Sequence, residues 1–337
     1  MTSMLAPSLL APSLLTLRIA AIDAPTSQIK TFTLEAADGA LLPGFEPGAH
    51  LQVEIPSSAT GGAPQWRSYS LIHLDVSADP RDGVRAYRLA VRREDEGRGG
   101  SRHMHALEVG AMLNVRTPVN HFPLAAPPRV LLIAGGIGIT PIVSMATALA
   151  AQHREYELHF SGRTRDALPF VDELRALAGK RLVLHADDDP ATRLSVDALL
   201  EGAQLNQPIY VCGPAGMIDA VLAAARKRGW HECDLHYELF SEAAPQEGDT
   251  AFEVELRSSG QRLTVPADRS LLDTLIENGA DVMYDCRAGY CGLCSTRVCS
   301  GDIEHRDSYL SDADKASGKV MQVCVSRCTS GRLVLDL

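Results

Sequence analysis

The sequence predicts a multidomain chain: an antiparallel β-barrel, an α/β domain built on a parallel sheet, and a small α+β domain, in that order. Three observations support this order. Short β-prone segments broken by Gly and Pro occupy residues 15–125. Strand-like and alanine-rich segments alternate over 126–242. After a polar stretch at 243–250, residues 251–337 contain four closely spaced cysteines. A chain of 337 residues has room for two or three such domains.

The barrel prediction depends on five segments of alternating or β-branched character. Turns rich in Gly and Pro separate them, as is typical of antiparallel sheets. The expected strands are 17–19, 30–34, 50–55, 67–72 and 86–91. Before them, Ala-Pro-Ser-Leu-Leu occurs twice in tandem, with no Lys or Arg ahead of the apolar stretch, which does not fit a secretory signal. We expect residues 1–14 to be a disordered extension.

The second domain is predicted from four apolar strands, each long enough to be buried in a parallel sheet. These strands are 130–134, 157–160, 182–186 and 209–212, and helices are expected at 142–151 and 218–227. The third domain should open with a hairpin of 252–256 and 262–265. A helix over 270–278 follows, with Ser270 as its N-cap. The cysteine loop comes directly after that helix.

The four cysteines form the most specific pattern in the chain. Cys286, Cys291 and Cys294 are spaced C-x4-C-x2-C, and Cys324 follows after 29 intervening residues. This spacing is typical of the thiolate ligands of a plant-type 2Fe-2S cluster. A zinc knot or buried free thiols are the alternatives, but zinc sites usually add a second close cysteine pair or histidines. Cys328 is the rival candidate for the fourth ligand position.

On these residues the chain resembles the phthalate dioxygenase reductase family, and residues 251–337 resemble plant-type ferredoxins. That family joins a flavin domain, a nicotinamide domain and a C-terminal ferredoxin, and it includes the reductases of vanillate demethylase and related Rieske-type oxygenases. The resemblance implies FMN, a 2Fe-2S cluster and NADH as cofactors. It also implies a separate Rieske-type oxygenase as the electron acceptor.

Two motifs indicate the flavin site. Arg67-Ser68-Tyr69-Ser70 lies on an expected barrel strand and resembles the family's flavin motif. Arginine can pair with a phosphate, a tyrosine ring can stack on the flavin, and a serine hydroxyl can reach the flavin N5 region. Gly99-Gly100-Ser101 can present backbone N–H groups to a phosphate. The resemblance favours FMN, although this chemistry does not exclude FAD.

Two glycine turns indicate the nucleotide site. The strand 130–134 runs into a turn and a helix start, whose candidate binding residues are Gly135, Gly136, Gly138, Thr140 and Pro141. Cys212-Gly213-Pro214 repeats this arrangement after another strand. In the family such a segment lies beside the nicotinamide. Arg163 follows a third strand, where an adenosine ribose is commonly bound. The aspartates at 187–189 would repel a 2′-phosphate, so NADH is favoured over NADPH.

Four residues are the catalytic candidates. Ser70 and Cys212 belong to the motifs above, and the resemblance adds Glu238 and Phe240 at the end of the nucleotide domain. A glutamate and an aromatic residue at this junction lie against the flavin and nicotinamide in the family. Phe240 could cover the flavin ring and leave when nicotinamide enters, or it could be an ordinary core residue.

Composition limits the classes of partner. The formal net charge of −10 disfavours nucleic acid. No apolar run reaches the ~20 residues of a membrane span. The chain is too long for a small disulfide scaffold and four of its eight cysteines are assigned to the cluster, so we expect a cytoplasmic location. We also expect a monomer. We interpret the chain as a reductase that passes electrons from NADH through FMN and the cluster to an oxygenase acting on an aromatic compound. The alternatives are a redox-sensing iron–sulfur flavoprotein and a reductase that serves a haem oxygenase.

Overall fold

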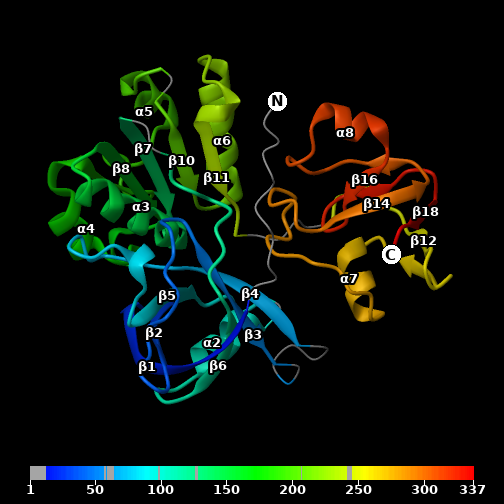
Figure 1. The fold of residues 1–337 in the computed structure, drawn as a ribbon. Coiled ribbons are helices and arrows are strands. Elements are labelled where there is room, and N and C mark those ends of the chain that lie inside the picture. Colours follow the sequence, from blue (N-terminus) through cyan, green and yellow to red (C-terminus); the bar gives the residue numbers. More distant parts are fainter. Residues whose placement is uncertain are drawn as a thin grey trace, which may run out of the picture. The chain divides into compact units, whose positions relative to one another are not determined.

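The computed structural model describes residues 13–56, 58, 64–97, 99–125, 128–205, 207–240 and 245–337. Its contacts divide the chain into two compact units, Met1–Glu238 and Leu239–Leu337. Figure 1 shows the elements of both units coloured along the sequence. Most of the extension expected at 1–14, and part of the stretch 243–250, lie outside the described residues. Leu14 already belongs to the first strand.

The N-terminal half of the first unit is a six-stranded antiparallel sheet in the order β4-β3-β6-β1-β2-β5. Ile72 N, two residues beyond β4, donates a 2.9 Å hydrogen bond to Arg88 O on β5, and this contact joins the two edge strands into a barrel. The short helix α2 (Gly100–Ala106) precedes β6. The strands are β1 (Leu14–Thr26), β2 (Ile29–Ala36), β3 (His50–Ile55), β4 (Gln65–Ser70), β5 (Ala86–Arg92) and β6 (Met112–Arg116).

Alternation along the barrel strands explains which side chains are inside. Leu51, Val53 and Ile55 of β3 are completely buried, as are Phe32 and Leu34 of β2. Because successive side chains of a strand point to opposite faces, these residues form one apolar interior. The intervening residues of β3 and β4 therefore share the opposite face, which becomes important for the site below.

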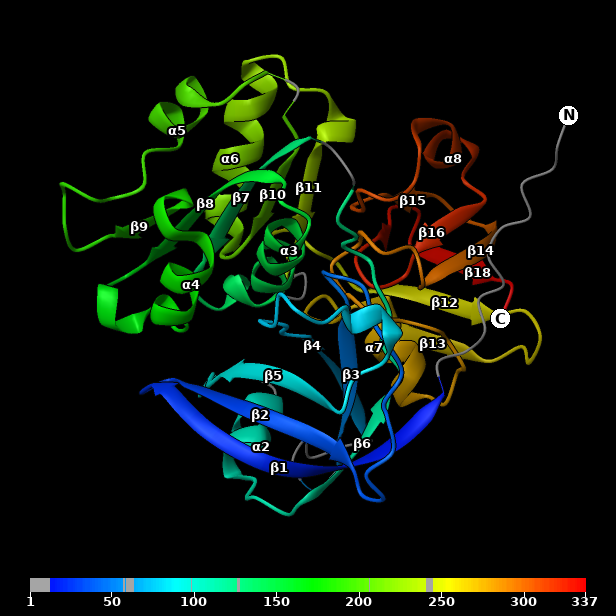
Figure 2. The same cartoon turned by 60° about the vertical axis from the view of Figure 1, so that its left-hand side comes forward.

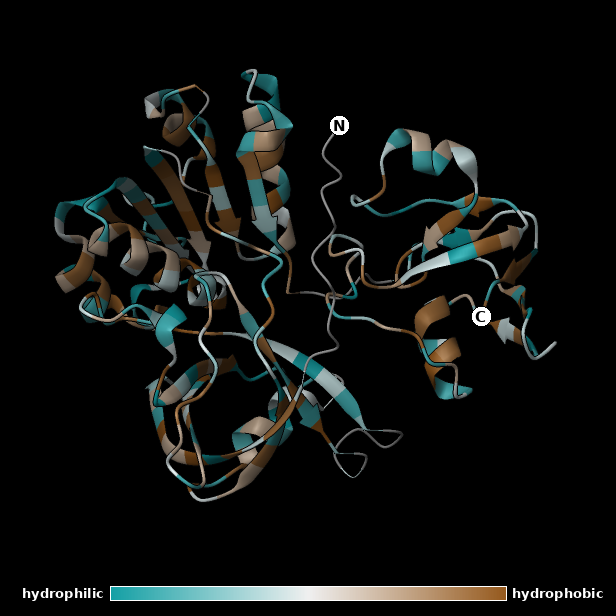
Figure 3. Cartoon of the chain, in the orientation of Figure 1, coloured by the Kyte–Doolittle hydropathy of each residue, from teal (hydrophilic) through white to brown (hydrophobic). Residues whose placement is uncertain are grey.

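The second half of this unit is a five-stranded parallel sheet in the order β11-β10-β7-β8-β9. Its strands β7 and β10 are almost entirely apolar, and the sheet is mostly brown in Figure 3. The strands are β7 (Arg129–Gly135), β8 (Glu155–Gly162), β9 (Leu182–Ala186), β10 (Ile209–Cys212) and β11 (Leu235–Glu238). The helices are α3 (Ile139–Ala151), α4 (Val171–Ala178), α5 (Val196–Gly202) and α6 (Ala215–Lys227), which surround the sheet in Figure 2.

The second unit, Leu239–Leu337, contains a mixed five-stranded sheet in the order β13-β12-β18-β14-β16 and the small pair β15-β17. Helix α7 (Leu271–Glu277) begins after Ser270, whose Oγ accepts a 3.0 Å hydrogen bond from Asp273 N. A second helix is α8 (Asp312–Ser317). The strands are β12 (Phe252–Leu256), β13 (Arg262–Val265), β14 (Ser295–Ser300), β15 (Ile303–Glu304), β16 (Val320–Gln322), β17 (Arg327–Cys328) and β18 (Arg332–Leu335).

The described elements agree with the sequence-based expectations in kind and differ mainly in their ends. Strands β3, β9, β10, β12 and β13 have the expected bounds. Helix α3 begins three residues earlier than expected, at Ile139, because the helix tolerates Pro141 within its first turn. The helices α2, α4, α5 and α8 and the strands β6 and β14–β18 were not predicted.

Candidate functional site

The second unit brings together the sulfur atoms of Cys286, Cys291, Cys294 and Cys324. Cys294 Sγ lies 3.2 Å from Cys324 Sγ, and the Cys286 thiol is in hydrogen-bond contact with those of Cys291 and Cys324. These thiol contacts, assisted by the N–H groups of Ala288 and Tyr290, hold the pKa of Cys286 well below its ordinary value. Four converging sulfurs with inward-pointing N–H groups fit an iron–sulfur cluster.

The loop can take this shape because three of its residues have left-handed backbone conformations. The φ angles are 52° at Arg287, 79° at Gly289 and 78° at Gly292. A Cβ atom on Gly289 would lie 2.8 Å from Val325 Cγ2, and one on Gly292 would lie inside the Tyr309 ring. The left-handed conformation favours glycine at both positions, and the limited space beside Val325 and Asp307 adds to this at Gly289.

Arg287, the non-glycine residue among these three, is anchored by an ion pair. Arg287 Nη1 lies 2.6 Å from Asp273 Oδ1 on α7, and the two side chains are only 7% and 17% exposed. The guanidinium carbon also lies 4.6 Å from the centre of the Tyr284 ring. This contact joins the cysteine loop to the helix that precedes it.

Cys328 is not a member of the sulfur cluster. It lies on β17, and its sulfur is 3.5 Å from Ser330 Oγ. Cys299, on β14, is exposed and is contacted by the Arg257 guanidinium. Residues 321 and 322 form the end of β16, whose pairing with β14 brings the chain back to the cluster at Cys324.

In the first unit, the two predicted flavin motifs meet. Arg67 on β4 packs against Gly100 at the start of α2, so that a Cβ on Gly100 would lie 3.1 Å from Arg67 Cγ. Gly99 has a φ of 89°, which suits glycine, and Ser101 Oγ accepts a 2.9 Å hydrogen bond from Glu94 N. The arginine and the first turn of α2 can therefore face one phosphate. Arg98, the neighbour of this glycine pair, lies outside the described residues.

The remaining residues of the motif alternate along β4. Tyr69 lies against the barrel core, and burial raises its pKa well above the ordinary value. Ser68 is exposed, whereas Ser70 is buried. The partner of Ser70 across the sheet is His50 on β3. Tyr69 and Ser70 therefore lie on opposite faces of the strand, with Tyr69 toward the barrel core and Ser70 on the face shared with His50.

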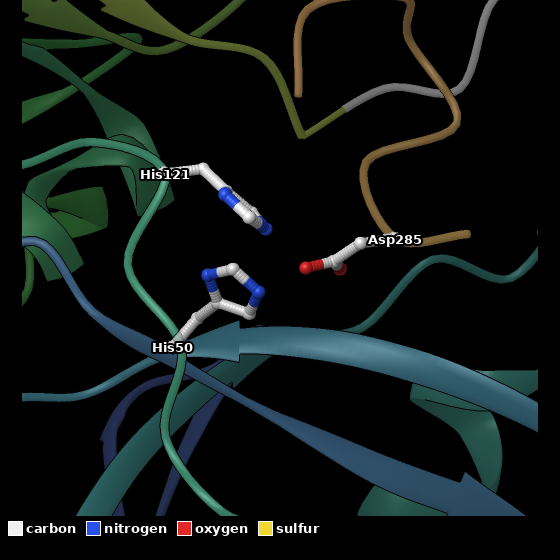
Figure 4. Close-up of side chains that lie close together, drawn as sticks. All are labelled: His50, His121 and Asp285. Carbon is white, nitrogen blue, oxygen red and sulfur yellow. The ribbon is translucent and has the colours of Figure 1, made fainter. Parts of the chain in front are cut away.

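His50 and His121 were missed by the sequence reasoning. Their ring centroids are 5.5 Å apart with an interplanar angle of 46° (Figure 4). The backbone of His50 also pairs with Val119, so the segment before His121 runs beside β3. The signal that places His50 opposite Ser70 is the register of β3 and β4, and sequence alternation alone does not fix that register.

The two predicted nucleotide turns pack directly against each other. They follow β7 and β10, which are neighbours, with Ala134 opposite Cys212. A Cβ atom on Gly138 would lie 2.3 Å from Cys212 O, and one on Gly213 would lie 2.9 Å from Gly135 Cα. The glycines thus allow two backbone turns to meet at the carboxyl edge of the sheet, where α3 and α6 begin.

The other nucleotide candidates occupy the same turns. Gly136 has a φ of 54°. Thr140 and Pro141 are buried in the first turn of α3, where Thr140 Oγ1 donates a 3.0 Å hydrogen bond to Ile137 O. Pro214 is the residue before α6, and its Cδ would lie 2.7 Å from a Cβ on Gly135.

Two of the catalytic candidates are adjacent on neighbouring strands. Cys212 on β10 is the register partner of Glu238 on β11, and both are buried. Burial, followed by the Glu238 charge, raises the pKa of the Cys212 thiol well above its ordinary value, so this thiol stays protonated.

The remaining candidates, Phe240 and Arg163, are exposed. Phe240 is 44% exposed and belongs to the second unit. Arg163 is exposed after β8, and its carbonyl accepts a 3.2 Å hydrogen bond from Asp188 N.

A pocket of about 460 Å³ lies elsewhere in the first unit. It is formed by the loop 73–81 and the second half of α3, and its lining includes His73, Asp79 and Thr147. None of the predicted site residues lines it, and we assign it no role.

Comparison with known proteins gives two matches to family models. Residues 254–329, which include all four clustered cysteines, match the 2Fe-2S iron–sulfur cluster binding domain. Residues 132–223, which include both glycine turns, match the oxidoreductase NAD-binding domain. The chain therefore has a 2Fe-2S domain and an NAD-binding domain.

Relatives match more than nine tenths of the chain. It is 40% identical to vanillate O-demethylase oxidoreductase of Pseudomonas putida, over 92% of this chain and 95% of the relative. It is 38% identical to the heme-dependent oxidative N-demethylase beta subunit of Ectopseudomonas mendocina (strain ymp), over 96% and 99%. The solved structure of phthalate dioxygenase reductase, described as a modular structure for electron transfer from pyridine nucleotides to [2Fe-2S], is 35% identical with a TM-score of 0.73, over 96% and 98%.

The chain belongs to the phthalate dioxygenase reductase family. Full-length matches above 30% identity establish this membership, and the order of the sheets agrees with it. As a member of this reductase family, the chain is an oxidoreductase of the type that forms the reductase subunit of monooxygenase and demethylase systems. No helix within the described ranges is long and apolar enough to cross a membrane.

Proposed function

We propose that this chain takes electrons from NADH, carries them through FMN and a 2Fe-2S cluster, and delivers them to a separate Rieske-type oxygenase or demethylase that acts on an aromatic compound. The observation that carries the proposal is the presence of two different electron sites in one chain. Four sulfurs converge in the second unit, and two glycine turns meet beside the buried pair of Cys212 and Glu238 in the first.

The residues around the glycine turns suit a hydride donor. The first turns of α3 and α6 offer backbone N–H groups to the pyrophosphate of NADH. The Cys212 thiol, which burial keeps protonated, and the Glu238 carboxyl would flank the nicotinamide at the strand ends. Phe240 is exposed, and the family resemblance supports a role for its ring in covering the flavin. These roles are proposals.

The barrel residues suit FMN. Arg67, with its side chain against Gly100, would pair with the FMN phosphate, and the amides of Gly99–Ser101 would add hydrogen bonds. Tyr69 would stack on the ring system, and the buried Ser70 hydroxyl would meet its N5 edge. When bound, a flavin can accept two electrons together as hydride and release them one at a time.

The cysteine residues suit the one-electron carrier. Cys286, Cys291, Cys294 and Cys324 would ligate the cluster, and the amides near Cys286 would stabilise its negative charge. We further propose that the domain bounds are 15–125, 126–242 and 251–337, and that the chain works as a cytoplasmic monomer. The four cysteines that are not proposed cluster ligands form no disulfide, which agrees with a reducing compartment.

Reconstitution with a partner tests the proposal. The purified chain, NADH and a Rieske oxygenase from an aromatic degradation system should give substrate oxidation that requires all three components. Cytochrome c serves as a general acceptor in a parallel assay. Rapid, sustained NADH oxidation in that assay supports a reductase, whereas a redox sensor would turn over only a few times. If sustained turnover is seen with cytochrome c but no Rieske oxygenase is reduced, the assigned partner class is wrong.

A second candidate acceptor is a haem enzyme. The similarity to the beta subunit of a heme-dependent oxidative N-demethylase extends over 96% of the chain and supports this possibility. The same assay, with a haem N-demethylase in place of the Rieske oxygenase, compares the two classes. The acceptor reduced with the higher kcat/KM identifies the class of partner.

A further inference from the structure

A series of hydrogen-bonded polar side chains, in which His159 is buried, crosses two strands of the nucleotide domain. His159 on β8 is 7% exposed, and its Nδ1 lies 2.9 Å from His185 Nε2 on β9. The two rings are nearly parallel, with centroids 5.2 Å apart and an interplanar angle of 18°. His159 Nε2 lies 3.0 Å from Glu157 Oε1, and His185 Nδ1 lies 2.9 Å from Thr192 O. None of the predicted site residues belongs to this hydrogen-bonded series.

The backbone carbonyl at its end fixes the hydrogens on both rings. A carbonyl oxygen only accepts, so His185 Nδ1 must carry the hydrogen of the 2.9 Å contact. In a neutral ring His185 Nε2 is then an acceptor, and His159 Nδ1 must donate to it. Burial lowers the pKa of both histidines. Because His159 Nδ1 donates to His185, His159 Nε2 can donate to Glu157 Oε1 only when the His159 ring carries both hydrogens, and the Glu157 carboxylate favours that charged form. His159 therefore holds the His185 ring in the orientation that lets it bond to Thr192.

Thr192 belongs to a compact turn, residues 187–193, that follows β9. Thr192 Oγ1 donates a 2.9 Å hydrogen bond to Asp189 Oδ2, and Thr192 N donates one of 3.0 Å to Asp189 O. At the other end of the turn, Arg193 Nη2 donates a 2.6 Å hydrogen bond to Asp187 O. The His185 bond thus anchors the turn to the sheet through the middle of this network.

The turn lies at the edge of the sheet where the dinucleotide is expected. Asp187 N donates a 3.0 Å hydrogen bond to Gly162 O, and Asp188 N donates one of 3.2 Å to Arg163 O. Gly162 and Arg163 follow β8, the neighbour of the glycine turn after β7. An acidic residue at this edge can accept hydrogen bonds from a ribose and repel a 2′-phosphate.

We propose that His185 is a positioning residue for the dinucleotide: with His159 holding its ring, it fixes the turn 187–193 and so places Asp187–Asp189 at the adenosine ribose. The proposal rests on the proposed function, since it assumes that NADH binds at this edge. It predicts that His185 controls the KM for NADH and the discrimination against NADPH. The kcat should instead depend on the residues proposed to flank the nicotinamide, Cys212 on β10 and Glu238 on β11.

Two substitutions that replace different nitrogen atoms of His185 test this role. In His185→Asn the side-chain amide stands close to the former Nδ1 and can still donate to Thr192 O. In His185→Gln the amide reaches the former Nε2 position, and the bond to Thr192 is lost. We expect His185→Gln to raise the KM for NADH by roughly three- to tenfold with kcat unchanged, and to bring NADH and NADPH closer in kcat/KM. His185→Asn should remain near the wild type.

The control is His231→Gln, because His231 is an exposed histidine of the same domain and should leave both kinetic constants unchanged. If the His185 variants do not fold, His159→Asn and His159→Leu provide the same contrast, since only the amide can still donate to His185 Nε2. Equal KM values for His185→Gln and the wild type would overturn the proposal, as would equal losses in His185→Gln and His185→Asn. Absence of NADH oxidation in the wild type would instead refute the proposed function itself.

Discussion

Gly138 lies so close to Cys212 that a Cβ atom at position 138 would stand 2.3 Å from the carbonyl oxygen of residue 212. This relationship joins the two glycine turns of the nucleotide domain, which are 74 residues apart in the sequence. The contact is between backbones, so a flexible side chain cannot relieve a clash there.

The first prediction concerns this contact. Gly138→Ala should destabilise the protein by about 1–3 kcal/mol, as overpacking of a buried contact does, and should raise the KM for NADH because the two turns must separate. Thermal unfolding and steady-state kinetics measure the two effects. Gly202→Ala is the control, because a Cβ there meets no atom within 4 Å. A stable Gly138→Ala protein with unchanged KM would show that the turns have room to move.

A second prediction tests the cluster ligands. Cys291→Ser and Cys324→Ser should lose the visible absorption of the 2Fe-2S cluster, while NADH still reduces the flavin. Cys299→Ser and Cys328→Ser should keep the cluster absorption, because these sulfurs lie outside the cluster of four. Retention of the absorption in Cys324→Ser together with its loss in Cys328→Ser would require a different fourth ligand.

The ion pair beneath the cysteine loop gives a third prediction. Asp273→Asn removes the partner of the buried Arg287 guanidinium, and breaking a buried ion pair costs about 3–5 kcal/mol. The variant should lose its cluster absorption at a lower temperature. Glu277→Gln breaks the exposed pair with Arg269 and should change stability by less than about 1 kcal/mol. Similar melting temperatures for the two variants would mean that Arg287 does not depend on this partner.

A fourth prediction concerns the flavin. Loss of a charged hydrogen-bond partner costs about 1.5–3 kcal/mol, so Arg67→Ala should bind FMN roughly tenfold to hundredfold more weakly. The variant should purify with depleted flavin, keep its cluster absorption, and recover NADH oxidation with excess FMN. Arg18→Ala, which breaks a half-exposed pair with Glu35 on the same barrel, is the control. Heat-released flavin from the wild type should be FMN. Release of FAD would overturn the phosphate role of Gly99–Ser101.

Much of the site could be predicted because its chemistry is encoded in short contiguous motifs. The first three cysteines, the segment 67–70 and the two glycine turns can each be recognised from fewer than ten adjacent residues. The structure adds how these motifs meet, for example Arg67 against Gly100 and Gly138 against Cys212.

What the sequence did not reveal depends on contacts between distant residues. The position of His50 opposite Ser70 is a matter of register, which turn lengths and packing decide. Strand β18 pairs with β12, about 80 residues earlier, and β17 has only two residues, too few to show alternation. His159 and His185 lie 26 residues apart on neighbouring strands. Only the order of strands in the sheet brings them together.

The most direct test of the central claim is to mix the protein with NADH without oxygen and follow flavin and cluster absorption by stopped flow. We predict that flavin absorption falls first, that cluster absorption then falls as the 2Fe-2S centre is reduced, and that Cys291→Ser shows the first phase alone. Reduction of the flavin in the wild type with the cluster remaining oxidised would contradict the account, because electrons from NADH would then not reach the proposed exit site.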